Sequence, residues 1–543
     1  MFNAKPESSN YNELITNIET GRVKIPQFQR KFVWSLDMTV KLLDSIVKGY
    51  PIGSFILWKT KDRLRSIRNI GGVNLPEPPK GDMIQYVLDG QQRMTSLYVA
   101  MKGLKINDDE RSDDFAEIYV DLEAKDDEPI VIYNTEGKPA DTLVRFTDLL
   151  NSPLVLIQKY PNCVSNPDYV KKMTEYSGKV TGYQFSVISV SDAPIEIATE
   201  IFTRLNVGGK ALSVFEIMVA KTYDAALNFD LAEKYDSLIK DLEKTGYETI
   251  SSSVVLQAVS ACLCKECAKK HILKLNKTTI INEWDKIISA FKGAVDYMYS
   301  GFRIPVSQLL PYDAILVPFT YYFYKHKGKV TVKHGKYLQD YFWRCVMTTR
   351  YSSGLESKLA QDIKQIDIIL DNQKPTYEDP VDISVEFLET HGWFSAGSSF
   401  VKGILCLLAS CQPKSFDNNS DVRIDNSWLK QSNSKNYHHF FPKAYLKKQG
   451  YEDADINHIA NITIVDDFLN KNMIRDKAPS KYIGGFMKKN PDLKKTLKTH
   501  LIGDPNAWGV MSNDYDKFFK KRLKKFHDEL ESRLILTKND RSL

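Results

Sequence analysis

The sequence predicts a multidomain α+β protein, and three observations lead to this prediction. With 543 residues, 43% of them hydrophobic, the chain is longer than a single domain usually is and can form several buried cores. The N-terminal part alternates strand-like and helix-like segments, whereas apolar residues in the segment 230–411 recur at helical spacing. A polar stretch, residues 412–435, then leads to a short β-prone run. We therefore expect domains at residues 1–228, 229–411 and 412–543.

The N-terminal domain is expected to contain a sheet with accompanying helices. Apolar residues three or four positions apart predict helices, which we place at residues 11–20, 36–47, 94–101, 195–205 and 212–227. Ser213 and Glu216 have the spacing of a capping box at the start of the last of these helices. Alternating or continuous apolar runs predict strands of one sheet, at residues 52–58, 83–88, 116–123, 130–133 and 183–190.

Composition argues against a membrane or secreted protein. The chain has no run of 18 or more apolar residues, and its N-terminus lacks a basic segment followed by an apolar one. Seven scattered cysteines are an odd number, which suits buried free thiols in a reducing compartment. Cys264, Cys267 and His271 could bind zinc, but a closed zinc site needs four ligands and no second pair lies nearby. We expect a cytoplasmic protein without a membrane partner.

Positive charge is concentrated at the C-terminus. The formal net charge is +6, yet residues 481–543 alone contain 15 Lys and Arg against 8 Asp and Glu. Such a segment could contact the phosphates of nucleic acid, although a solvated helix face is the alternative. The candidate nucleic-acid contacts are Lys520, Lys521, Lys524 and Lys525.

The motif Asp89-Gly90-Gln91-Gln92-Arg93 joins a predicted strand to a predicted helix. A strand, a tight glycine turn and a helix start together offer backbone N–H groups and a helix dipole to an anion. Arg93 could pair with a phosphate, Gln91 and Gln92 could supply amide contacts, and Gly90 would allow close approach. Asp89 could act through a metal or a polarised water, or it could cap the helix. A capped helix with an exposed Arg93 is the alternative interpretation.

Paired histidines mark the start of the C-terminal domain. The run Asn436-Tyr437-His438-His439-Phe440-Phe441-Pro442 is followed by Asn457, Asn461 and Asn470. One imidazole can take a proton from water near neutral pH, and the other, with an Asn, can hold a divalent cation against a phosphate. Exposed loop histidines and helix-capping asparagines are the alternative.

The histidines and asparagines resemble the His-Asn-His (HNH, or His-Me finger) nuclease pattern, in the version with Asn in place of the last His. The resemblance rests on His438-His439-Phe440-Phe441-Pro442, Asn461 and Asn470. It implies a ββα-metal fold in which His439 is the general base. His438 and Asn470 would then bind Mg²⁺ or Mn²⁺, and Asn461 would orient the loop that carries the base.

Three N-terminal motifs resemble the N-terminal domain of GmrSD-type modification-dependent restriction enzymes. They are Ile25-Pro26-x-Phe28-x-Arg30, the Asp89–Arg93 motif, and Phe202-Thr203-Arg204-Leu205-Asn206-x-Gly208-Gly209. The resemblance covers about residues 10–225 and implies a ParB/sulfiredoxin-like α/β fold that binds an NTP. The implied nucleotide-binding residues are Arg30, Asp89, Gly90, Gln91, Gln92, Arg93, Arg204 and Asn206.

Together these observations predict an NTP-responsive, divalent-metal-dependent DNA endonuclease with NTPase activity that restricts foreign, modified phage DNA. One nuclease site cuts one strand, so a double-strand break would require a homodimer or two events. An alternative is a nucleotide-gated DNA-binding regulatory protein with a secondary or inactive nuclease module. A third interpretation, an RNase or toxin, differs only in the nucleic acid that is attacked.

Overall fold

The computed structural model of the chain separates into two compact units, Met1–Leu231 and Ala232–Leu543, each described here by itself. The predicted division of the chain into three domains stays a prediction. The structure describes residues 3–26, 32–64, 66–67, 69–70, 73–79, 81–107, 112–125, 128–205, 213–224, 226–395, 397–426, 437–466 and 469–542.

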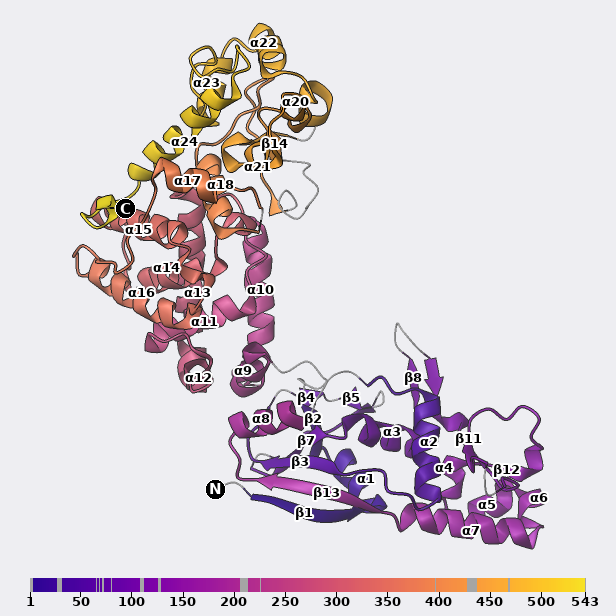
Figure 1. Cartoon of the computed structure of the whole chain (residues 1–543). Helices are drawn as coiled ribbons and strands as arrows, with labels where there is room; N and C mark the ends of the chain where they lie inside the picture. Colours follow the sequence, from indigo (N-terminus) through magenta and orange to yellow (C-terminus); the bar gives the residue numbers. More distant parts are fainter. Residues whose placement is uncertain are drawn as a thin grey trace. The chain divides into compact units, whose positions relative to one another are not determined.

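A six-stranded mixed sheet forms the centre of the first unit (Figure 1). Its strand order is β1-β13-β3-β7-β2-β4, in which β13 and β3 are parallel, β2 and β7 are parallel, and the other neighbours are antiparallel. The strands are β1 (Asn3–Asn10), β2 (Val23–Pro26), β3 (Phe55–Thr60), β4 (Ser66–Ile67), β7 (Ile84–Asp89) and β13 (Gln184–Ser191). Alternate residues such as Phe55, Leu57 and Val87 are buried in the core because successive strand side chains point to opposite faces.

The helices of the first unit confirm most of the predicted helical segments. They are α1 (Tyr11–Glu19), α2 (Leu36–Val47), α3 (Gln91–Lys102), α4 (Phe146–Leu149), α5 (Pro153–Lys159), α6 (Pro161–Val164), α7 (Pro167–Thr181), α8 (Ile195–Leu205) and α9 (Val214–Thr222). The capping box of Ser213 and Glu216 is present at the start of α9, as predicted. Helix α3 begins three residues before the predicted start, so Gln91, Gln92 and Arg93 form its first turn.

The prediction that residues 116–123 and 130–133 join the main sheet is wrong. They contribute β10 (Tyr119–Asp121) and β11 (Val131–Ile132) to a separate sheet with β12 (Leu143–Arg145). This small sheet and α4 to α7 lie to one side of the main sheet, beyond α2 and α3 (Figure 1). The small sheet packs against helices instead, with β11 in contact with α2 and β12 in contact with α4. Two hairpins complete the unit: β5 (Asn69–Ile70) with β6 (Val73–Asn74), and β8 (Lys105–Asn107) with β9 (Ser112–Asp114).

The second unit begins with the helical segment that periodicity predicted. Its helices are α10 (Leu231–Glu243), α11 (Ser252–Cys264), α12 (Lys269–Ile272), α13 (Lys277–Ser300), α14 (Leu316–Lys325), α15 (Val332–Met347), α16 (Leu355–Leu370), α17 (Val385–His391) and α18 (Ser399–Ser410), with short 3₁₀ turns that include η5 (Arg350–Ser352). Among the described residues, no helix is both long enough and apolar enough to cross a membrane.

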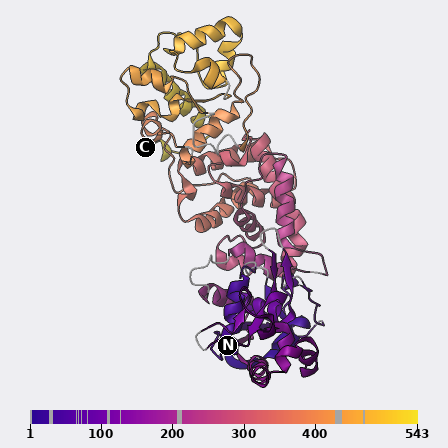
Figure 2. The same cartoon turned by 90° about the vertical axis from the view of Figure 1, so that its right-hand side faces the viewer.

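The last part of the second unit contains an antiparallel hairpin surrounded by helices. Its elements are β14 (Tyr437–His439), α20 (Lys443–Lys448), α21 (Asp453–Ile456), η6 (Ile459–Asn461), β15 (Ile462–Ile464), the π-helix η7 (Leu469–Ile474), α22 (Pro479–Lys489), α23 (Leu493–Lys498), α24 (Tyr515–Glu531) and η8 (Asp540–Ser542). The elements from β14 to α23 gather at one end of this unit in both views (Figures 1 and 2), whereas η8 lies beside α15. Helix α24 contacts both parts of the unit, because Phe518 lies in the core beside the hairpin whereas His527 bonds to the carbonyl of Ile383 at 2.8 Å.

Candidate functional site

The hairpin β14–β15 places the two histidines on opposite faces. His438 lies opposite Thr463, and His439 lies opposite Ile462. Because side chains alternate along a strand, His438 is directed into the protein and is only 2% exposed. His439, the last residue of β14, is partly exposed. His439 is therefore accessible to a substrate, whereas His438 lies beneath the surface.

The imidazole of His439 is held in one orientation by Asn457. Its Nε2 lies 3.0 Å from Oδ1 of Asn457, so in the neutral ring Nε2–H donates this bond and Nδ1 is the basic nitrogen. Burial lowers the pKa of His439 below its usual 6.5; the bond to Asn457 opposes that shift, and the charge of Lys443 adds to it. A neutral imidazole with a free basic nitrogen is the form that a general base requires.

Asn461 fixes the loop that follows His439. Its side chain is fully buried; Oδ1 accepts from the amide of Phe441 at 2.8 Å, and Nδ2 donates to the carbonyls of Phe441 and Ile456 at 3.0 and 3.1 Å. These bonds use the amide for positioning and leave it no contact with a substrate. These bonds join Asn461 to the loop after His439, and its role in orienting a catalytic base stays a prediction.

Aromatic packing anchors the same loop. Phe440 and Phe441 are both fully buried, and the ring of Phe440 stacks on Phe518 with centroids 4.9 Å apart. The hydroxyl of Tyr482 donates to the carbonyl of Phe440 at 2.5 Å, and the Tyr482 ring lies 6.2 Å from the ring of His438. Removal of either phenylalanine would open a cavity directly beneath the histidines.

A buried polar layer lies behind β15. Thr463 donates to Nδ1 of His500 at 2.7 Å, and Nε2 of His500 donates to the carbonyl of Lys414 at 2.7 Å. Burial lowers the pKa of His500 to about 3, so this ring is neutral. Arg522 is fully buried and donates to the carbonyl of Ile462 at 3.1 Å. Burial lowers the pKa of Arg522 to about 9.

The structure tests only part of the predicted metal site. His438 offers an imidazole nitrogen, a donor that divalent transition ions accept well. Asn470 belongs to η7, but its side chain is outside the described part of the chain. Within the described ranges, no group of three or more His, Cys, Asp or Glu side chains could hold a metal ion. The roles of His438 and Asn470 as metal ligands therefore stay predictions.

The N-terminal motif forms a tight turn between β7 and α3. Asp89 ends the strand, and Gly90 has φ of 90°, a left-handed conformation that favours glycine. A Cβ at this position would also lie 2.6 Å from the ring of Phe55. Within the described residues, no side chain caps the N-terminus of α3, and the N-terminus of a helix is where backbone N–H groups can bind an anion.

Most side chains of this turn bond to the protein itself. Arg93 donates to the carbonyls of Ile52 and Ser54 at 2.6 and 3.0 Å and pairs with Asp89 at 3.2 Å. Gln92 accepts from the amide of Val33 at 2.8 Å and donates to Gln91 at 2.7 Å. Three of the five N–H groups of a guanidinium are thereby engaged. The hydrogen bonds of Arg93 and of the two glutamines therefore stabilise the conformation of the turn.

The other predicted nucleotide-binding residues are not brought to this turn by any described contact. Arg30 and Asn206 lie outside the described residues. Arg204 is 78% exposed on α8 and pairs with Glu200 at 2.6 Å. Their part in a nucleotide site stays a prediction.

The four predicted DNA-binding lysines of α24 are not equivalent. Lys524 pairs with Asp528 at 3.0 Å and Lys525 pairs with Glu529 at 2.9 Å. Lys520 and Lys521 are exposed and form no ion pair within the described ranges. Among the described residues, only two of the four positive charges therefore lack a neighbouring carboxylate.

A second basic surface lies beside the histidine hairpin. A groove of about 260 Å³ is lined by Lys477, Lys481 and Lys489 over a floor that includes Tyr482, the residue that contacts His438. Lys481 forms no ion pair within the described part of the chain, and Lys489 is 3.6 Å from Asp417. We call this surface the α22 groove.

The sequence did not indicate which residues position the histidines, although Asn457 was noted as one of the asparagines after them. Asn457, Tyr482 and Arg522 each bond to the hairpin or to the loop after it. Asn457 stands four positions before Asn461, and this short spacing was the available signal. The contacts of Tyr482 and Arg522 span 42 and 60 residues, and no local pattern predicts contacts of that range.

Comparisons with known proteins agree with the N-terminal resemblance. Residues 11–223 match the family model for the GmrSD restriction endonuclease, N-terminal domain. This match supports the GmrSD family for that part of the chain. The uncharacterized protein MJ0686 of Methanocaldococcus jannaschii is 24% identical, and the alignment covers 98% of each chain.

Proposed function

We propose that this protein is a divalent-metal-dependent endonuclease that nicks or cleaves foreign DNA in response to an NTP. The observation that carries the proposal is the orientation of His439, whose ring is fixed by Asn457 with Nδ1 left basic. The match to a restriction-endonuclease domain suggests a restriction-type function, and DNA is the substrate that this function implies. A modified base or backbone as the recognised feature is part of the proposal.

In the proposed reaction, Nδ1 of His439 accepts a proton from a water molecule, whose oxygen attacks the phosphorus in line with the leaving 3′ oxygen. Asn457 keeps the proton on Nε2 during this step, and Asn461 holds the loop in place. His438 and Asn470 would hold Mg²⁺ or Mn²⁺, which supplies charge stabilisation to the pentavalent phosphorus and the leaving oxygen. An imidazole ligand favours Mn²⁺ over Mg²⁺.

The α22 groove is the surface that best suits the DNA backbone near His439. Its three lysines flank Tyr482, which contacts both His438 and the loop after His439. Phosphate contacts from such lysines would position the strand without reading its sequence. Lys520 and Lys521 on α24 would add contacts farther along the duplex, whereas Lys524 and Lys525 are already paired.

The N-terminal turn is proposed to bind the NTP through the N-terminal N–H groups of α3 and through the two N–H groups of Arg93 that make no hydrogen bond within the described residues. Asp89, half-exposed at the turn, could hold a cation or polarise a water for NTP hydrolysis. Gly90 would let the phosphate approach the backbone, and Gln91 and Gln92 would support the turn. Arg30, Arg204 and Asn206 are proposed to complete the pocket.

A plasmid-nicking assay on the full chain tests this function. Supercoiled plasmid, plain or with modified cytosine, is incubated with Mn²⁺ or Mg²⁺, with or without ATP or GTP, and with EDTA as control. We expect metal-dependent nicking that increases with an NTP and with modification. Absence of nicking with either metal on every substrate would contradict the endonuclease proposal. Sedimentation at several protein concentrations tests whether the chain forms the homodimer that a double-strand break in one event would require.

A nucleotide-gated DNA-binding regulator is the second candidate. The near-complete burial of His438 favours it, because a ligand that cannot reach a cation would leave the nuclease inactive. Electron paramagnetic resonance, used to measure the binding of Mn²⁺, separates the two candidates. The endonuclease should bind Mn²⁺ through His438, whereas the regulator should bind DNA but not Mn²⁺ at this site. Replacing the plasmid with single-stranded RNA tests the RNase alternative.

A further inference from the structure

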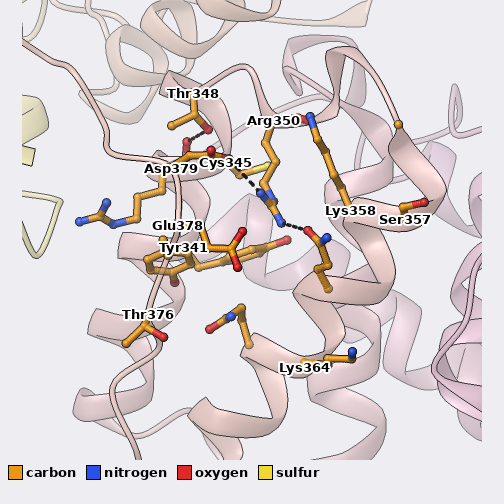
Figure 3. Close-up of a pocket in the computed structure, with 15 residues that line it drawn as sticks. Tyr341, Cys345, Thr348, Arg350, Ser357, Lys358, Lys364, Thr376, Glu378 and Asp379 are labelled. Carbon is orange, nitrogen blue, oxygen red and sulfur yellow. Dashed lines mark hydrogen bonds and ion pairs between the residues drawn. The ribbon is translucent and has the colours of Figure 1, made fainter. Parts of the chain in front are cut away.

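A large cavity in the helical part of the second unit belongs to neither site described above. It has a volume of about 790 Å³ and lies between the end of α15, the turn η5, helix α16 and residues 376–379 (Figure 3). Small-molecule sites in proteins have volumes of about 300–1,000 Å³. Its size is therefore that of a ligand site.

The wall formed by α16 and η5 is basic. Lys358 and Lys364 both lie on α16, Lys358 beside Arg350 at one end of the cavity and Lys364 toward the other end (Figure 3). The guanidinium of Arg350 is engaged by Asp362 at 2.7 Å and by Gln361 at 3.1 Å. Lys358 donates one hydrogen bond, to the carbonyl of Arg350 at 2.7 Å, and neither lysine has an ion pair within the described residues. Two ammonium groups are thus left to neutralise an anion.

The remaining cation of the cavity has a structural role. Arg344 bonds to Asp340 at 3.1 Å and to Asp540 at 2.6 Å, and its side chain is 5% exposed. It also lies over the ring of Tyr377 at 5.0 Å. Arg344 therefore supports the wall and does not offer its charge to a ligand.

Two buried polar atoms of the lining make no hydrogen bond within the described residues. They are the hydroxyl oxygen of Tyr377 and Oε1 of Gln365. Buried polar atoms in proteins almost always have a partner, because an unpaired one loses the hydrogen bonds that water provided. Glu378 lies on the wall that faces α16 (Figure 3). Gln365 and Glu378 both offer acceptor oxygens to N–H or O–H groups of a ligand.

We infer that this cavity binds a nucleoside phosphate. The phosphate lies between Lys358 and Lys364, whose long side chains reach it from the two ends of the cavity, and the donor groups of the base or sugar face Gln365, Glu378 and the hydroxyl of Tyr377. A ligand that fills the cavity needs both a phosphate and a base or sugar, because the lysines recognise the anion and the acceptor oxygens recognise N–H and O–H groups. This site is independent of the proposed nuclease reaction and of the Asp89–Arg93 turn.

Calorimetric titration of the full chain with AMP, GMP, CMP and UMP tests the inference. Adenosine and inorganic phosphate are the partial ligands. We expect at least one monophosphate to bind in one-to-one ratio and more tightly than either partial ligand. Lys358→Ala and Lys364→Ala should each weaken binding by about tenfold or more, the usual effect of losing a charged hydrogen bond. Lys336→Ala, an exposed lysine of α15 outside the cavity, is the matched control and should bind as the parent does.

Tyr377→Phe provides a second test that does not depend on surface charge. The parent hydroxyl makes no hydrogen bond within the described residues, so we expect the variant to unfold at the same temperature as the parent or higher. Addition of the monophosphate should then stabilise it less than it stabilises the parent.

Three outcomes would overturn the inference. The first is that no monophosphate binds at millimolar concentration. The second is that binding is undiminished in both Lys358→Ala and Lys364→Ala. The third is that binding is abolished in Arg93→Ala and kept in Lys364→Ala, which would assign the nucleotide to the N-terminal turn. Retention in Arg93→Ala with loss in Lys364→Ala supports the cavity.

Discussion

The Asp89–Arg93 turn and the His438–Asn461 hairpin use their polar side chains in opposite ways. At the turn, Arg93 and Gln92 bond to the backbone of residues 52–54 and 33, so the motif residues themselves hold the fold. At the hairpin, positioning is done by Asn457 and Asn461, which leaves Nδ1 of His439 available for chemistry. A motif residue can therefore bind a ligand or stabilise the fold, and its hydrogen-bond partners distinguish these two roles.

The largest expected effect is at the hairpin. His439→Ala should reduce plasmid nicking by about 10²–10⁴-fold or more, because it removes the proton acceptor, while DNA affinity and the unfolding temperature change little. His391→Ala, an exposed histidine of α17, is the control and should nick as the parent does. Nicking by His439→Ala at the parent rate would show that this histidine is not the base.

Substitution of Asn457 should have the next largest effect. Asn457→Ala removes the acceptor for Nε2–H and should reduce nicking by about 10–100-fold, by analogy with the loss of a hydrogen-bond partner of a metal-bound imidazole. DNA affinity, measured in EDTA, should be unchanged. An equal loss of DNA affinity would assign Asn457 to substrate binding.

The pH dependence sharpens this prediction. His439 acts as a base only when neutral, and its pKa is lowered below 6.5, so the parent rate should persist below pH 6.5 and fall as the pH drops through the lowered pKa. Asn457→Asp places a carboxylate beside the ring, which raises the pKa. Its rate should therefore fall at a higher pH than that of the parent. An unshifted profile would contradict the contact between the two side chains.

At the turn, the structural role of Arg93 predicts that its substitution lowers the stability of the first unit. Arg93→Ala leaves the carbonyls of Ile52 and Ser54 without their donor and should lower the free energy of unfolding of the first unit by about 1–3 kcal/mol. Arg204→Ala, 78% exposed, should change it by less than about 0.5 kcal/mol. Urea unfolding followed by fluorescence measures both. If Arg93→Ala instead keeps full stability and loses NTP affinity, Arg93 is chiefly a ligand.

The smallest effect is expected from the lysines of α24. The double variant Lys520→Ala/Lys521→Ala should bind DNA with a weaker dependence on salt. The slope of the logarithm of the binding constant against the logarithm of the salt concentration should become shallower by up to about 0.9 for each phosphate that the variant no longer binds. Lys524→Ala with Lys525→Ala should change the slope less, since these lysines are paired with Asp528 and Glu529. Equal slopes in the two double variants would mean that the ion pairs open on DNA.

Local patterns predicted the helices better than the sheet. Helix α9 was predicted with its capping box because Ser213 and Glu216 are three residues apart. Strand β1 was not predicted, because Asn3–Asn10 is polar and mostly exposed. It becomes a strand through pairing with β13 and through Glu7, which accepts hydrogen bonds from Lys59 and Ser189 at 2.8 and 2.7 Å. Those contacts span 52 and 182 residues, beyond the reach of any local pattern.

The chemistry of the candidate site was readable from residue types, but its arrangement was not. His438 and His439 are adjacent in sequence, and strand alternation explains why one is buried and the other accessible. Which nitrogen of His439 stays basic depends on Asn457, 18 residues away. By contrast, the ion pairs of Lys524 and Lys525 with Asp528 and Glu529 have the i,i+4 spacing of a helix, which the sequence does show.

The position of Asp540 in the chain has a consequence for biosynthesis. Its carboxylate accepts from Arg344 at 2.6 Å and from the amide of Val381 at 2.9 Å, and these bonds lower its pKa. Arg344 leaves the ribosome almost two hundred residues before Asp540 does. Until Asp540 has emerged, Asp340 is the carboxylate partner of this guanidinium within the described residues, and the helical core around Arg344 can close fully only after Asp540 has been synthesised.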